Sequence, residues 1–247
     1  MIITRTPYRV SFFGGGTDYP TWYQKCGGRV LVSAIDKYCY VSMRYLPEFF
    51  EHKTRAVWSK VELVSNNLDI ENPAIRSVIE YVNKADVGFE IGHQGDLPAR
   101  SGMGSSSSFV VGLLNAHWGL TNHIYHDSPL SLAKTAVRIE QEFVGDTVGI
   151  QDQHAAALGG VNMLSIATSG EVSVYPCHQE ICDELEGRLL LIFLGTTRHA
   201  SGIAEVQVAE MDRHYEAMHK MMGLVIDGYE VLTGLRPLDH MPELLNE

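Results

Sequence analysis

Residues 97–108 read Leu-Pro-Ala-Arg-Ser-Gly-Met-Gly-Ser-Ser-Ser-Ser, and residues 109–114 continue as Phe-Val-Val-Gly-Leu-Leu. Gly102 and Gly104 let the backbone adopt positive φ and approach a ligand closely. Serines at the start of an apolar helix supply caps and hydroxyl donors. Free N–H groups and the positive end of the helix dipole would then meet at one point, which predicts a phosphate site. A serine-rich linker is the alternative, and the apolar helix that follows at once favours the phosphate site.

This stretch belongs to neither of the two best-known phosphate loops. No Gly-Lys-Ser/Thr follows the glycines, as a Walker loop requires. The third glycine of the dinucleotide-binding fingerprint is also missing. The phosphate site is therefore of a third kind.

A second stretch carries two carboxylates twelve positions apart, Glu140 and Asp152. In phosphoryl transfer one carboxylate could hold Mg²⁺, while the other orients or deprotonates an acceptor hydroxyl. The alternative makes Glu140 part of a solvated helix face and Asp152 a helix N-cap. For two carboxylates without further context, the second interpretation is the commoner one.

A third stretch, residues 6–19, places Arg9 on a strand among apolar neighbours and ends in Gly14-Gly15-Gly16-Thr17-Asp18-Tyr19. Three glycines in succession leave room for a ligand beside the backbone. Asp18 could accept hydrogen bonds from sugar hydroxyls, and Arg9 could be a buried cation or one that faces a cleft. A tight hairpin with a solvated aspartate is the competing interpretation.

Composition places the chain among globular proteins and argues against several partners. The 247 residues are 45% hydrophobic and 20% charged, with a net charge of −11. A general binder of nucleic acid or of an anionic membrane needs a basic face, which this composition does not offer. The four cysteines do not form a disulfide framework, so we expect reduced thiols. The N-terminus lacks a signal-peptide pattern, and we expect a soluble, cytoplasmic protein.

Hydrophobic periodicity predicts a mixed order of strands and helices, arranged in two layers. We expect strands over 8–13, 29–46, 56–64, 87–93, 161–165, 171–175 and 188–194, the last of them buried. We expect helices over 73–84, 105–119, 130–144 and 201–226. The polar, acidic stretch 177–187 marks the place of a domain boundary, if the chain has one.

Together the three stretches resemble the GHMP small-molecule kinases, which include galactokinases, homoserine kinases and mevalonate kinases. The phosphate loop is similar to that family's Pro-x-x-x-Gly-Leu-Gly-Ser-Ser-Ala/Ser motif, with Met103 in place of leucine. Gly149-Ile150-Gln151-Asp152-Gln153 is similar to the galactokinase stretch with the catalytic aspartate, and Glu140 falls at the magnesium glutamate. The turn at residues 14–19 and the later stretch 195–201 look like the branch of D-glycero-D-manno-heptose 7-phosphate kinases.

The resemblance implies an α+β fold of two domains. Residues 1–180 would form the N-terminal ATP-binding domain, an α/β sandwich like that of a ribosomal small-subunit protein. Residues 181–247 would form an incomplete ferredoxin-like domain. The family's final glycine-rich motif has no counterpart here, so we expect a truncated C-terminus.

The resemblance also assigns roles. ATP phosphates would lie on Pro98, Gly102, Met103, Gly104, Ser105, Ser106 and Ser107. Ser106 and Glu140 would bind Mg²⁺, Asp152 would act on the acceptor hydroxyl, and Arg9 would stabilise charge on the transferring group. The sugar or sugar-phosphate acceptor would lie against Gly15, Gly16, Thr17 and Asp18. Apart from the resemblance, Arg198 is a lone cation in a Thr/Ser-rich turn and could contact the distal phosphate of the acceptor.

These roles predict an ATP-dependent sugar kinase that phosphorylates the anomeric hydroxyl of a heptose 7-phosphate. The alternatives are a galactokinase-like or fucokinase-like enzyme and a truncated, non-catalytic protein that binds a nucleotide or a sugar. The oligomeric state is not predicted.

Overall fold

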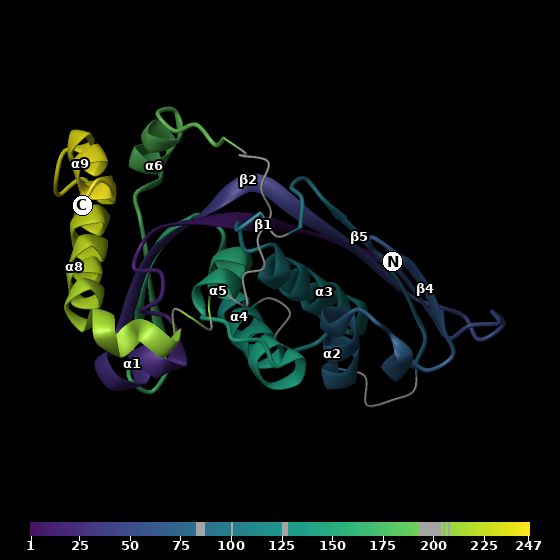
Figure 1. The fold of residues 1–247 in the computed structure, drawn as a ribbon. Coiled ribbons are helices and arrows are strands. Elements are labelled where there is room, and N and C mark those ends of the chain that lie inside the picture. The colour runs from purple at the N-terminus through teal and green to yellow at the C-terminus, as the bar shows by residue number, and fades with distance from the viewer. Residues whose placement is uncertain (83–86, 100, 125–127, 193–203, 205, 207) are drawn as a thin grey trace. The chain divides into compact units, whose positions relative to one another are not determined.

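A computed structural model of the chain describes residues 1–82, 87–99, 101–124, 128–192, 204, 206 and 208–247 (Figure 1). These residues form two compact units, each made of several segments. The first unit comprises residues 1–8, 36–148 and 152–158, and the second comprises 9–35, 149–151 and 159–247. Strands β1 (Ile2–Phe13) and β2 (Gly28–Tyr45) are long, and each contributes one part to each unit.

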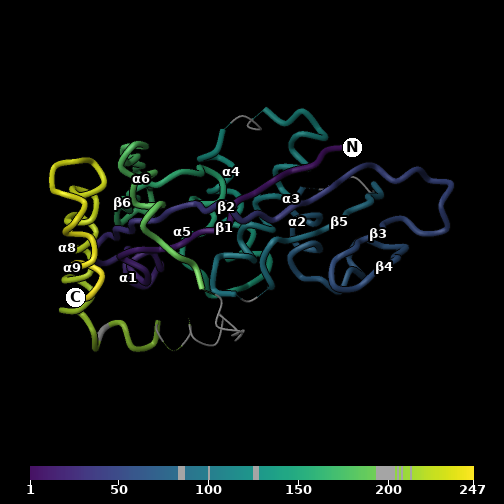
Figure 2. Tube along the Cα trace, turned by 90° about the horizontal axis from the view of Figure 1, so that it is seen from above, coloured from purple at the N-terminus to yellow at the C-terminus, as the bar shows by residue number. Residues whose placement is uncertain are grey.

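The first unit is built on the C-terminal part of β2. It pairs antiparallel with β5 (Phe89–Gly95), with Cys39 opposite Gly95 and Tyr45 opposite Phe89. Strand β3 (Thr54–Val57) runs parallel to β5, and β4 (Val61–Val64) returns antiparallel to β3. Figure 2 shows the β3–β4 pair beside β5. The sheet is therefore mixed, as the α+β prediction allows.

The helices of the first unit cover one face of this sheet (Figure 1). They are α2 (Pro73–Val82), α3 (Ser105–Thr121), α4 (Pro129–Arg138), a π-helix (Ile139–Val144) and α5 (Gln151–Leu158). Helix α2 buries Ile75, Val78 and Ile79, which recur at helical spacing. Helix α3 is buried along most of its length, and its continuous apolar run 109–114 is buried throughout. A 3₁₀ turn (Asn67–Asp69) precedes α2.

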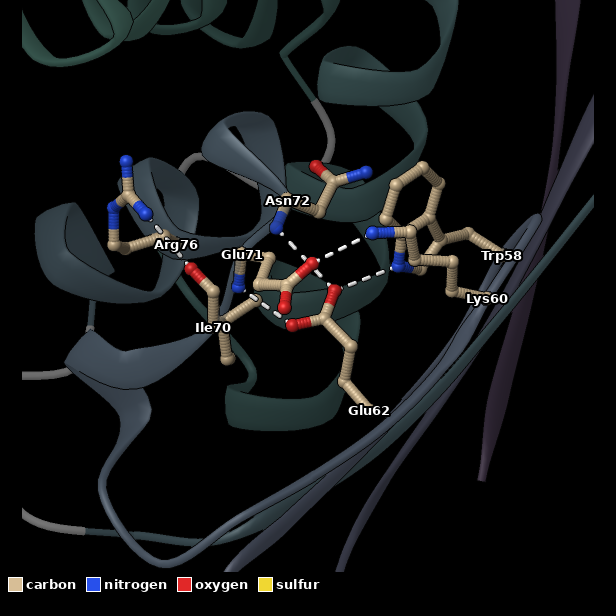
Figure 3. A network of polar contacts seen from close by, with 7 residues as sticks. All are labelled: Trp58, Lys60, Glu62, Ile70, Glu71, Asn72 and Arg76. Carbon is tan, nitrogen blue, oxygen red and sulfur yellow. Dashed lines mark hydrogen bonds and ion pairs between the residues drawn. The ribbon is translucent and has the colours of Figure 1, made fainter.

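A buried carboxylate fixes the start of α2 (Figure 3). Glu62 on β4 is 8% exposed. It accepts hydrogen bonds from the Trp58 indole at 2.7 Å and from the backbone N–H groups of Glu71 and Asn72 at 2.5 and 3.3 Å. Lys60 pairs with the side chain of Glu71 at 2.8 Å. These bonds hold the two residues that precede α2 against β4.

The second unit is built on the N-terminal part of β2, which pairs antiparallel with β6 (Val161–Ile166); β7 (Val172–Pro176) then pairs antiparallel with β6. Its helices are α1 (Pro20–Cys26), α6 (Gln179–Glu186), α8 (Tyr215–Leu232) and α9 (Met241–Leu245), with 3₁₀ turns at Met211–His214 and Leu238–His240. Its main core contains Phe13, Leu31, Met163, Leu185, Val225, Val231, Leu232 and Met241.

Several predicted elements need correction. Residues 189–192 form no strand and are 49–83% exposed, so the prediction of a buried strand there was wrong. An apolar run gives the composition of a strand, but a strand also needs a pairing partner. The stretch 56–64 is two strands joined by a tight turn, and the polar stretch 177–187 contains α6. Residues 193 and 194 lie outside the described residues, as does most of 201–207.

Among the described residues no helix is long and apolar enough to cross a membrane. All four cysteines are free thiols, as expected. The predicted boundary near residue 180 stays a prediction.

Candidate active site

The phosphate loop begins helix α3. Gly102 has φ +78° and Gly104 has φ +72°, a left-handed conformation that favours glycine at both positions. Gly104 is the N-cap of α3, and its carbonyl oxygen accepts the first helical hydrogen bond from Ser108 at 2.9 Å. A Cβ added at Gly102 would meet nothing within 4 Å, so the backbone is open on this side. The loop thus has the free space and the helix terminus that an anion needs.

The serines of the loop differ in what they contact. Ser108 is fully buried and donates from its hydroxyl to the Pro7 carbonyl at 2.8 Å, which anchors α3 to β1. Ser107 is 3% exposed, and its hydroxyl lies close enough to the Glu140 carboxyl group to lower the pKa of that group. Ser106 is exposed, which suits a contact with nucleotide. The described residues therefore place Ser107 beside Glu140, whereas the sequence analysis named Ser106.

Glu140 is a buried carboxylate on the π-helix. It is 1% exposed, so the alternative of a solvated helix face was wrong. Burial raises the pKa of Glu140 to about 7, while the Gln153 amide and the nearby Ser107 hydroxyl lower it and the nearby charges of Asp152 and Asp146 raise it. Gln153 donates to Glu140 Oε2 at 2.5 Å. Glu140 Oε1 is buried and has no hydrogen-bond partner among the described residues.

This donor set fits a magnesium ion. A buried carboxylate oxygen without a partner is costly unless a cation or a donor satisfies it. Mg²⁺ prefers oxygen ligands and is usually held by one or two carboxylates together with substrate phosphates. Within the described ranges no three His, Cys, Asp or Glu side chains gather into a metal site. Glu140 and Ser107 would therefore hold the ion together with nucleotide oxygens.

Asp152 is the second residue of α5 and is partly exposed, so it is a residue of the helix and not its N-cap. Its charge is near enough to Glu140 to raise the pKa of that carboxyl group. Arg9 is half-buried on β1. Both Asp152 and Arg9 take part in polar or electrostatic interactions of their own.

In the second unit the glycine turn is held by Thr17. Gly14 and Gly16 have φ +88° and +98°. A Cβ at Gly14 would lie 2.0 Å from the Arg29 carbonyl oxygen, so only glycine fits there. The buried Thr17 hydroxyl lies 2.8 Å from the Gly14 carbonyl oxygen and 2.7 Å from that of Arg29, and it accepts from the Arg29 N–H at 3.1 Å. Thr17 thus fixes the shape of the turn.

Asp18 holds the start of α5. It is fully buried, and its Oδ2 accepts from the N–H groups of Ile150 and Gln151 at 3.0 and 3.1 Å. Its Oδ1 accepts from the Gly16 N–H at 3.1 Å and from the Gln151 side chain at 3.4 Å. Four donors match the acceptor capacity of a carboxylate. The solvated aspartate considered as an alternative was therefore wrong, and a contact of Asp18 with sugar stays a prediction.

The structure brings together part of the predicted site. The first unit gathers Ser107, Glu140 and Asp152, and the second unit joins Gly16 and Asp18 to Ile150 and Gln151. Pro98 and Met103 lie on the described loop, whereas Arg198 lies outside the described residues. The sequence analysis gave no role to Gln153. Its signal was a polar residue, followed by His154, just before the small apolar run Ala155–Ala157.

Comparison with known proteins identifies the family of the chain. Residues 70–160 match the family described as GHMP kinases N terminal domain. The chain is 31% identical over 233 residues to the D-glycero-alpha-D-manno-heptose 7-phosphate kinase of Campylobacter jejuni, covering 88% of this chain and 67% of that protein. It is 33% identical over 177 residues to the galactokinase of Pyrococcus furiosus, covering 64% of this chain and 44% of that enzyme.

Solved structures show the same likeness. The fold resembles a D-glycero-D-manno-heptose 1-phosphate kinase of Bacteroides thetaiotaomicron with a TM-score of 0.79 and 26% identity, covering 95% of this chain and 74% of that one. A mevalonate kinase structure of 18% identity shares the fold, with a TM-score of 0.67. The chain belongs to the GHMP kinase family.

Proposed function

We propose that this chain is an ATP-dependent sugar kinase that phosphorylates the anomeric hydroxyl of D-glycero-D-manno-heptose 7-phosphate. The observation that carries the proposal is the buried Glu140 carboxylate beside Ser107, close to the start of α3 and within electrostatic reach of Asp152. The named relative from Campylobacter jejuni and the Gly14–Gly16 turn support the heptose acceptor over galactose.

The chain binds the triphosphate through backbone and hydroxyl groups. The loop of Gly102 and Gly104 gives the phosphates access to the N-terminus of α3, whose N–H groups and dipole favour anions. Pro98, Met103, Ser105 and Ser106 complete the loop. Bound Mg²⁺ would neutralise charge that develops on the transferring phosphoryl group. Glu140 and Ser107 would hold that ion, and Ser106 stays a candidate ligand.

Asp152 acts on the acceptor. It takes the proton of the sugar hydroxyl as the new bond to the γ-phosphorus forms and the bond to the leaving β-phosphate oxygen breaks. Arg9 contributes a cation that stabilises the charge of the transferring group. Phosphoryl transfer requires little covalent chemistry from the protein. The positioning of Asp152 and Arg9 therefore dominates the rate.

The acceptor lies against the glycine turn. Gly15 and Gly16 offer backbone groups to the sugar, and Thr17 and Asp18 keep the turn in shape. Arg198 contacts the distal phosphate of the acceptor. Residues 1–180 act as the ATP-binding domain and 181–247 as part of the second domain. The use of ATP agrees with a cytoplasmic location.

The substitution Asp152→Asn tests the catalytic role. Asparagine keeps the size and hydrogen-bonding ability of aspartate but accepts no proton, so we expect a loss of turnover of about 10²–10⁴-fold. Nucleotide affinity, measured by calorimetry with a non-hydrolysable ATP analogue, should change less than about two-fold. Sugar-phosphate formation by the variant at the wild-type rate would remove Asp152 from the mechanism.

A further inference from the structure

Gln153 lies next to Asp152 and is fully buried on α5. Its side-chain amide donates from Nε2 to Glu140 Oε2 at 2.5 Å. A glutamine with no exposed surface loses its water partners, so this single contact accounts for the placement of its amide. The two residues are 13 positions apart in sequence and come from different helices of the first unit.

The contact occupies one of the two oxygens of the Glu140 carboxylate. Oε2 is held by Gln153, whereas Oε1 is buried and has no hydrogen-bond partner among the described residues. Three side-chain torsions place a glutamate carboxylate, and the last of them sets its plane; a donor on one oxygen restricts that last torsion. The second oxygen is then presented in one direction, as a metal ligand must be.

The backbone under Glu140 is held as well. Its carbonyl oxygen accepts from the N–H of Gly145, five residues on, and from that of Asp146 at 3.0 Å. Such a π-turn widens the helix locally and is frequent at functional sites. The π-turn fixes the backbone position of Glu140, while Gln153 fixes the orientation of its carboxylate.

We propose that Gln153 is a positioning residue: its amide fixes the Glu140 carboxylate so that Oε1 faces the magnesium ion, and it couples that ligand to the helix that carries Asp152. The inference rests on the proposed function for the identity of the ion. It concerns a residue that touches neither substrate nor metal and acts through Glu140.

The test measures metal binding apart from turnover. Mn²⁺, a paramagnetic substitute for Mg²⁺, is titrated into the protein with a non-hydrolysable ATP analogue, and free Mn²⁺ is read by electron paramagnetic resonance. Gln153→Met keeps the length of the side chain and removes the donor, and Gln153→Asn keeps an amide that is too short to reach. Both should weaken Mn²⁺ binding about 10–100-fold, the usual effect of losing a partner of a metal ligand.

Gln141→Leu is the matched control. Gln141 is the neighbour of Glu140 on the same π-turn, but its amide donates to the Val148 carbonyl at 3.0 Å. This variant should bind Mn²⁺ within about two-fold of wild type. The inference is overturned if Gln153→Met binds Mn²⁺ as wild type does, if Gln141→Leu loses as much affinity, or if the wild-type complex binds no Mn²⁺.

The two claims can fail separately. If wild type transfers no phosphoryl group to any sugar while Gln153→Met still weakens Mn²⁺ binding, the positioning role stands and the proposed activity fails. If wild type is an active kinase and Gln153→Met binds Mn²⁺ normally, the positioning role fails alone. In an active kinase Gln153→Met should also raise the Mg²⁺ concentration needed for half-maximal rate.

Discussion

At the residue scale, the buried environment of Glu140 disfavours the ionised form of its carboxyl group. It is 1% exposed, and burial raises its pKa from 4.5 to about 7. Between these two pH values the folded protein binds more protons than the unfolded chain, so the stabilising contribution is present below pH 4.5 and is lost as the pH rises through 7. Above pH 7 the metal-free protein therefore holds a costly buried charge, a cost that metal binding would relieve.

This predicts that Glu140→Gln stabilises the metal-free protein at alkaline pH. At pH 8 the gain in free energy of unfolding should be on the order of 1–3 kcal/mol, since each pKa unit corresponds to about 1.4 kcal/mol. At pH 4, where Glu140 is protonated in the folded protein and mostly protonated in the unfolded chain, the variant and the wild type should agree within about 0.5 kcal/mol. Urea unfolding at the two pH values, with a chelator present, measures both. A variant less stable than wild type at pH 8 would show that the buried charge of Glu140 does not destabilise the folded protein at that pH.

At the element scale, the start of α5 depends on a close contact. A Cβ added to Gly149 would lie 1.9 Å from Asp18 Oδ2, the oxygen that accepts from Ile150 and Gln151. Helix α5 begins at Gln151 and carries Asp152 as its second residue. The backbone just before Asp152 is thus held by the close contact between Gly149 and Asp18.

Gly149→Ala should therefore displace Asp18 and lower both stability and turnover. Overpacking of a filled site costs about 1–3 kcal/mol, and a misplaced Asp152 should reduce the rate about 10²-fold. Gly223→Ala on α8 is the control, because a Cβ there meets nothing within 4 Å. That change should be neutral or stabilise by about 0.5–1 kcal/mol. Thermal unfolding measures the change in stability, and initial rates measure the change in turnover. Equal effects of Gly149→Ala and Gly223→Ala would contradict the proposed dependence of the start of α5 on Gly149.

The elements also show where sequence reasoning ends. The helix after the phosphate loop was predictable, because Gly102, Gly104 and the serines are typical of a helix N-terminus. The burial of Glu140 was not, because its partner Gln153 lies on another helix. The bonds from Asp18 to Ile150 and Gln151 join residues 132 and 133 positions apart. Periodicity within one segment carries no information about such pairs.

At the scale of the whole molecule, the order of motifs predicted more than any single motif did. The α+β fold and the kinase family were predictable from the glycine turn, the phosphate loop and the stretch 149–153 taken in order. The apolar run 189–192 was mispredicted as a strand, because an apolar run alone does not show whether a partner strand pairs with it. The net charge of −11 is compatible with anionic substrates, because the first turn of α3 supplies a local positive field.

The most direct test of the whole account is a competition for one phosphoryl donor. The protein is incubated with Mg·ATP and equal amounts of D-glycero-D-manno-heptose 7-phosphate, galactose, fucose and mannose, and the products are identified by mass spectrometry, with Asp152→Asn as the control. We expect one product, a heptose bisphosphate that forms in the wild type and is lost in the variant. Phosphorylation of galactose or fucose in its place, or no transfer by a folded protein that binds ATP, would contradict it.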